Sequence, residues 1–137
     1  MPTRVGTILS PTLALVYQGR LLWFGSVLIA VLWGILRPEG PSTPVPETWL
    51  SSQQFALILH VSAFLALALT ARLAFNVRPG WQVWPVLFLA ALALEFLQAF
   101  LQPESRHFSW LDIGANAVGV ILAMMVWPWL REFLRAQ

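Results

Sequence analysis

The chain has 137 residues, of which 58% are hydrophobic and only 10% are charged. Soluble domains carry about 25% charged residues, so this composition argues against a cytosolic enzyme, a disordered tail or a nucleic-acid-binding module. The net charge of +2 comes from arginines that are scattered rather than clustered, and no nucleic-acid partner is expected. Because cysteine is absent, disulfides, thiolate nucleophiles and sulfur-ligated metals are excluded. We expect a single membrane-embedded, all-α domain over residues 1–137.

Apolar stretches divide the chain into membrane spans. A hydrocarbon core of about 30 Å requires roughly 20 apolar residues per helix. Four stretches reach or approach that length, namely residues 21–36, 55–75, 84–101 and 112–130. The first span extends back to residue 13 if Gln18 and Arg20 snorkel toward the membrane surface, and both starting points stay open. The sequence predicts a polytopic helical bundle of about four transmembrane helices.

Proline-containing segments separate these spans. Residues 37–50 contain four prolines, which remove backbone donors and fix φ. Pro79 and Gly80 form a turn dipeptide, and Pro103 lies near the start of a third loop that ends at residue 111. All three segments are predicted to be loops.

Arginine is distributed unevenly between the two sides of the four-span arrangement. One side receives Arg4, Arg20, Arg72, Arg78, Arg131 and Arg135, whereas the other receives Arg37 and Arg106. Cytoplasmic flanks of membrane proteins are enriched in Arg and Lys, so this bias predicts that both termini face the cytoplasm. Among them, Arg72, Arg131 and Arg135 are expected to anchor the protein on the cytoplasmic side and to contact anionic membrane lipid.

Three polar side chains lie inside the predicted spans at a common depth. His60 and Asn116 come shortly after the outer starts of their spans, and Glu95 comes shortly before the outer end of its span. With a rise of about 1.5 Å per residue, all three lie about 6–9 Å below the outer boundary. Ionisable groups within a span usually face protein or water, so we expect these side chains to converge.

Helical spacing places further polar residues beside these three. Gln98 follows Glu95 at i+3 and Asp112 precedes Asn116 by four residues, so each pair shares one helix face. The loop between the two pairs carries Arg106, whose planar guanidinium suits a carboxylate or a phosphate. We expect these residues and the histidine to form a pocket that opens to the outer face.

Gly119 is the centre of a small-xxx-small pattern with Ala115 and Ala123. This spacing lets a neighbouring helix backbone approach closely. We therefore expect the fourth span to pack tightly against another span.

The same polar residues carry a family resemblance. Their order and spacing resemble the signature of VanZ-like membrane proteins, in the run Glu95, Gln98, Pro103, Arg106, Ser109, Asp112, Asn116 and Gly119. His60, followed four residues later by the aromatic Phe64, matches the histidine of that family. The resemblance covers roughly residues 50–125. It implies a small, multi-pass helical protein of the bacterial cytoplasmic (inner) membrane, in a family named for a protein associated with resistance to the glycopeptide teicoplanin.

The ionisable candidates allow both functional and structural interpretations. His60 is either a proton carrier or ligand at the site or a structural partner of Glu95. Glu95 is interpreted as functional, with a buried ion pair to Arg106 as the alternative. Arg106 either binds an anionic head group or neutralises Glu95 and Asp112.

The remaining candidates have simpler structural explanations. Asp112 is interpreted first as a helix-capping residue, and Asn116 and Gln98 as groups that form interhelical hydrogen bonds. Ser109 lacks a recognisable base partner for nucleophilic chemistry and is kept as a binding candidate. No His-x-x-x-His or Glu-x-x-His spacing supports a metal site, and no cofactor is expected.

The leading hypothesis is a membrane protein that recognises, with or without modifying it, an anionic or polar envelope component at the outer leaflet. A lipid-linked cell-wall or surface-glycan precursor is the expected class. If the protein is catalytic, Glu95 and His60 exchange a proton while Arg106 holds the anion. The alternative is a non-enzymatic accessory subunit whose polar cluster only locks its own helices while it docks into a larger membrane complex.

Overall fold

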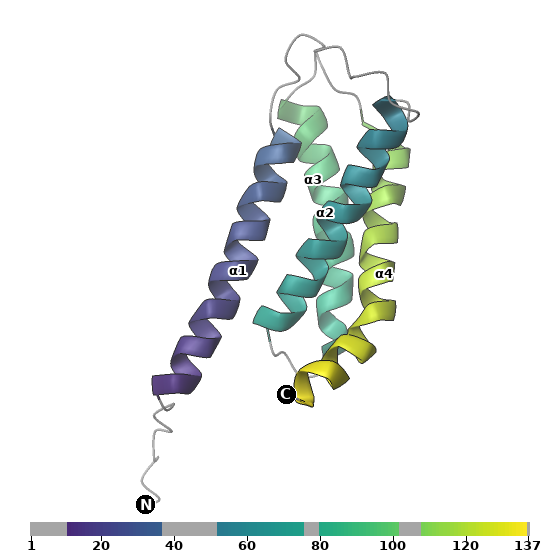
Figure 1. The fold of residues 1–137 in the computed structure, drawn as a ribbon. Helices are drawn as coiled ribbons and strands as arrows, with labels where there is room; N and C mark the ends of the chain where they lie inside the picture. Colours follow the sequence, from purple (N-terminus) through teal and green to yellow (C-terminus); the bar gives the residue numbers. More distant parts are fainter. Residues whose placement is uncertain (1–10, 37–51, 76–79, 102–107, 137) are drawn as a thin grey trace, which may run out of the picture.

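The computed structural model describes residues 11–36, 52–75, 80–101 and 108–136 (Figure 1). Its regular elements are α1 (Pro11–Leu36), α2 (Ser52–Ala74), the 3-10 turn η1 (Gly80–Gln82), α3 (Val83–Leu101) and α4 (Trp110–Arg135). Over these ranges no strand occurs, and the all-α prediction is confirmed. Each predicted span falls on one helix to within one residue, and α1 contains both starting points considered for the first span.

The helices expose apolar surface and bury little of it. Three segments are long and apolar enough to cross a membrane, namely Gln53–Ala74, Gly80–Leu101 and Trp110–Arg135, and the apolar part of α1, Gln18–Gly34, is shorter. No more than 28% of the apolar window in any of the three long segments is buried inside the bundle. Large side chains such as Leu22, Leu89 and Met125 point outward. Such an exterior suits lipid, where helices satisfy their own backbone hydrogen bonds.

The four helices run side by side with unequal packing (Figure 1). The closest association is between α2 and α4, α1 packs mainly on α2, and α3 packs mainly on α4. Contacts between α1 and α3 are few. The buried apolar core lies around α2 and includes Phe64, Leu67 and Ala68, with Val120 and Ala123 from α4.

The two ends of the bundle differ in their charged and polar residues. We call the end where α2 and α4 begin and α3 finishes the polar end, because it carries His60, Glu95, Gln98, Asp112 and Asn116. We call the opposite end the arginine end, because it carries Arg20, Arg72, Arg131 and Arg135. These four are all the arginines among the described residues.

A glycine sets the close packing of α2 against α4. A Cβ atom on Gly119 would lie 2.5 Å from the carbonyl oxygen of Val61 and 2.9 Å from the backbone nitrogen of Leu65. Both are backbone atoms of α2, which cannot move aside as a flexible side chain can. Ala115 and Ala123 are buried on the same face, and the predicted close approach of the fourth span is confirmed.

Proline bends the last helix. Pro128 lies inside α4, which continues to Arg135. Proline removes a backbone donor and its ring clashes with the carbonyl four residues earlier, which kinks a helix. Figure 1 shows the yellow end of α4 turning beneath the bundle, and this turn carries Arg131 and Arg135 across the arginine end.

The packing at Gly119 predicts a position-specific loss of stability. We expect Gly119→Ala to lower the free energy of unfolding by about 1–3 kcal/mol, because the added methyl group overpacks the α2–α4 contact. Thermal or denaturant unfolding in a mild detergent measures the change. The matched control is Gly114→Ala in the same helix, where a Cβ meets nothing within 4 Å. Equal stability of the two variants would contradict the close approach.

Candidate functional site

The start of α4 is built by Ser109. Its φ of −122° and ψ of 114° are extended, and its side-chain oxygen accepts a hydrogen bond of 3.2 Å from the backbone N–H of Asp112. This is the usual role of an N-cap serine, which satisfies one of the free donors in the first helical turn. The predicted capping role of Asp112 is corrected, because Ser109 is the N-cap; Asp112 lies in the first turn, where an acidic residue complements the helix dipole as expected.

A carboxylate from another helix completes this cap. The backbone N–H of Ser109 donates a hydrogen bond of 2.9 Å to Oε1 of Glu95 on α3. In a capping box, an acidic or amide side chain three residues after the cap takes that N–H, but here Glu95 takes it instead of Asp112. The carboxylate of Glu95, which is only 3% exposed, thereby lies at the positive end of the α4 dipole.

A second contact joins α2 to α4 at the polar end. Nδ1–H of His60 donates a hydrogen bond of 2.9 Å to Oδ1 of Asn116, which is 1% exposed. The interhelical bonding predicted for Asn116 is confirmed. This bond also orients the imidazole ring, and it leaves the other ring nitrogen, Nε2, for a different partner.

That other ring nitrogen faces an acidic residue. Nε2 of His60 lies 4.0 Å from Oδ1 of Asp112, and the two side chains are 11% and 24% exposed. This distance exceeds that of a hydrogen bond, but it forms an ion pair when the histidine is protonated, and a water molecule can bridge such a separation. Both side chains of this pair are partly exposed.

These contacts form one continuous polar network across three helices. Glu95 accepts from Ser109, Ser109 accepts from Asp112, Asp112 faces His60, and His60 donates to Asn116. The expected convergence of side chains from three spans is thus present, although the link from His60 to Glu95 passes through the start of α4. We call these five residues the polar network.

The other predicted site residues have less defined places. Gln98 is 2% exposed and lies one turn beyond Glu95 on α3, so its burial agrees with a helix-joining role. Arg106 lies outside the described residues. Among the described residues, no group of three or more His, Cys, Asp or Glu side chains could hold a metal ion.

Comparison with known families identifies the family of this chain. The sequence profile of the VanZ/LLP1 family matches residues 21–131. The chain belongs to the VanZ/LLP1 family. The match begins within α1 and ends within α4, so it includes the whole polar network. Searches of curated proteins and of solved structures find no match.

An aromatic group beside the network was not predicted from the sequence. In this VanZ/LLP1 protein the ring of Phe108 lies 4.8 Å from that of Phe96 and 4.9 Å from that of Trp110, measured between centroids. Phe96 follows Glu95 in α3, whereas Phe108 and Trp110 flank the Ser109 cap. The rings therefore join the end of α3 to the start of α4 alongside the hydrogen bond. The only sequence signal is that each ring neighbours a network residue.

The bond between His60 and Asn116 predicts coupled effects of mutation. In a double-mutant cycle with His60→Ala and Asn116→Ala, we expect a coupling free energy of about 0.5–1.5 kcal/mol, the range of interhelical hydrogen bonds in membranes. Unfolding in mild detergent provides the four stabilities. A control cycle pairs His60→Ala with Ser26→Ala, an exposed position on α1, and should be additive. Additivity in the first cycle would contradict the bond.

Proposed function

We propose that this VanZ/LLP1 protein recognises the polar head group of a lipid-linked envelope precursor, of the cell wall or of a surface glycan, at its polar end. The observation that carries the proposal is the polar network, which places a buried carboxylate, a histidine and a second carboxylate together inside an otherwise apolar bundle. Ionisable groups at membrane depth are costly and mark functional sites by default.

The exposure of the network favours a binding role over a purely structural one. Asn116 and Glu95 are buried, whereas His60 and Asp112 are partly exposed. A ligand therefore approaches the histidine–aspartate pair first, and the buried members hold that pair in place. Asn116 orients the histidine, while Glu95 and Ser109 fix the start of the helix that carries Asp112.

The donors and acceptors of the network favour a ligand rich in hydroxyl and amide groups. Ionised carboxylates accept hydrogen bonds only, so the partly exposed Asp112 suits sugar hydroxyls and peptide amides better than a bare phosphate. The anionic part of a precursor requires a cation as its partner. We assign Arg106 to this role. The head group of a glycan precursor offers both kinds of partner on one molecule.

The arginines at the arginine end support an orientation in which the polar end faces outward. Arginine is enriched on the cytoplasmic side of membrane proteins, and the arginines at the arginine end are Arg20, Arg72, Arg131 and Arg135. We therefore place the polar network at the outer leaflet of the bacterial cytoplasmic membrane, with both ends of the chain in the cytoplasm.

The proposal predicts that the bond from Ser109 to Glu95 is needed for binding. Glu95→Gln keeps an oxygen that can accept from Ser109, but a neutral amide accepts a weaker hydrogen bond than a carboxylate does, so Asp112 is held in place less firmly. We expect this variant and His60→Ala each to weaken binding of a lipid-linked disaccharide–peptide precursor by about tenfold, equivalent to about 1.4 kcal/mol. Binding is measured with fluorescent precursor and purified protein, and teicoplanin susceptibility is measured in bacteria that express each variant.

A distant glutamate provides the matched control. Glu132→Gln makes the same chemical change at an exposed position on the arginine end, and it should bind as the wild type does. Wild-type binding by a correctly folded Glu95→Gln protein would contradict the proposal. If Glu95→Gln instead fails to fold and the wild type purifies with a stoichiometric protein partner, the accessory-subunit alternative replaces it.

A further inference from the structure

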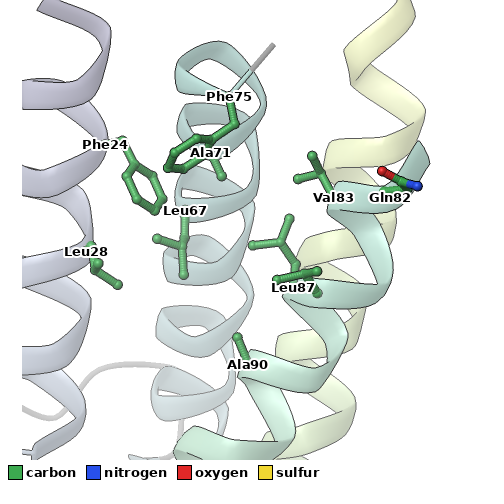
Figure 2. Close-up of a pocket in the computed structure, with 10 residues that line it drawn as sticks. Phe24, Leu28, Leu67, Ala71, Phe75, Gln82, Val83, Leu87 and Ala90 are labelled. Atoms are coloured by element: carbon green, nitrogen blue, oxygen red, sulfur yellow. The ribbon is translucent and has the colours of Figure 1, made fainter. Parts of the chain in front are cut away.

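An apolar groove lies on the side of the bundle away from the α2–α4 contact. Its volume is about 380 Å³ and it is partly open to the surroundings. Helices α1 and α3 form its two walls and α2 forms its floor, with Leu28, Leu67 and Leu87 among the lining residues (Figure 2). The groove exists because α1 and α3 make few direct contacts.

An aromatic pair lines the groove on the side of the arginine end. Phe24 of α1 and Phe75 at the end of α2 contact each other edge to face, with 5.1 Å between ring centroids. Both line the groove, together with Gln82, and Figure 2 shows the two rings side by side between α1 and α2. Toward the middle of the bundle the wall of α3 continues to Ala90.

A positive charge lies directly beyond this aromatic pair. Arg20, Phe24 and Leu28 are spaced at i, i+4 and i+8 on α1, so they share one helix face. Phe24 and Leu28 line the groove. Arg20 therefore lies on the same face of α1, one turn beyond Phe24 toward the arginine end. Unlike Arg72, whose guanidinium lies over the ring of Trp127 at 4.8 Å, Arg20 is exposed to the surroundings.

The overall charge of this end favours an anion. Against four arginines, the acidic residue described at the arginine end is Glu132 on α4. In addition, Nε of Arg72 is buried without a hydrogen-bond partner. The carboxylates Glu95 and Asp112 lie at the opposite end. A negatively charged head group is therefore attracted to the arginine end.

We propose that this groove binds one acyl chain of an anionic glycerophospholipid from the leaflet at the arginine end, with the lipid phosphate beside Arg20. The walls of the groove provide apolar contacts along the acyl chain, which itself has no polar groups to satisfy. Arginine presents a planar fork of donors that matches a phosphate. This site is separate from the polar network and does not depend on the function proposed for it.

Two matched pairs of variants test the site. Ala90→Phe fills the groove from α3, whereas Ala93→Phe adds the same ring at an exposed position on the same helix, outside the groove. Arg20→Gln removes the charge beside the groove, whereas Arg135→Gln removes a charge at the exposed end of α4. Circular dichroism and size-exclusion chromatography in mild detergent establish that each variant is folded.

Binding is measured by native mass spectrometry with phosphatidylglycerol and with phosphatidylcholine that carries the same acyl chains. We expect the wild type to retain one phosphatidylglycerol and to prefer it over phosphatidylcholine by about fivefold, the effect of one arginine near an anionic head group. Ala90→Phe should weaken binding of both lipids by about tenfold, and Arg20→Gln should abolish the preference. The two controls should match the wild type.

Three results would overturn the proposal. Equal lipid binding by Ala90→Phe and Ala93→Phe would exclude the groove as the binding site. Equal affinity of the wild type for the two lipids would exclude recognition of the negative head group. An unchanged preference in folded Arg20→Gln would exclude Arg20 as its partner.

Discussion

The hydrogen bond from the Ser109 backbone to the Glu95 carboxylate is the interaction on which the polar end depends. It fixes where α4 begins, and the start of α4 in turn places Asp112 opposite His60 and Asn116 within reach of the same ring. It also gives the buried carboxylate a hydrogen-bond donor at the positive end of the α4 dipole. Without this bond the three helices would share a core but no common polar group.

The packing of the bundle divides it into a tight half and a loose half. Gly119 lets α2 and α4 approach closely, and both helices contribute to the polar network. On the other side α1 and α3 stand apart, and the space between them is the groove. The closely packed side therefore carries the histidine, Asp112 and Asn116 of the polar network, while the loosely packed side leaves an apolar groove.

The sequence predicted the helices and the common level of the polar residues along the bundle, because both follow from simple lengths. A span needs about 20 apolar residues, and a rise of about 1.5 Å per residue gives the depth of a side chain. Spacing within one helix also identified the face that Asp112 shares with Asn116. None of these arguments needed knowledge of which helices are neighbours.

Partners between helices were predicted less well, because helical periodicity gives a face but not what lies opposite it. His60 was paired with Glu95, whereas it bonds to Asn116 and faces Asp112. Ser109 was kept only as a binding candidate, whereas its side chain caps α4 and its backbone N–H donates to a carboxylate 14 positions earlier in another helix. The groove was also not predicted, since it arises from a weak contact between two helices that are not consecutive in sequence.

The distance between the Glu95 carboxylate carbon and the Ser109 nitrogen tests this account most directly. Solid-state NMR in lipid bilayers measures it from the dipolar coupling between ¹³C-labelled glutamate and ¹⁵N-labelled serine, and the signal is assigned by its loss in the Glu95→Gln protein. We predict a strong coupling, as expected for two groups in direct hydrogen-bonding contact. A folded protein without measurable coupling between these two atoms would show that Ser109 at the start of α4 does not bond to Glu95 of α3. The polar network would then not exist as described.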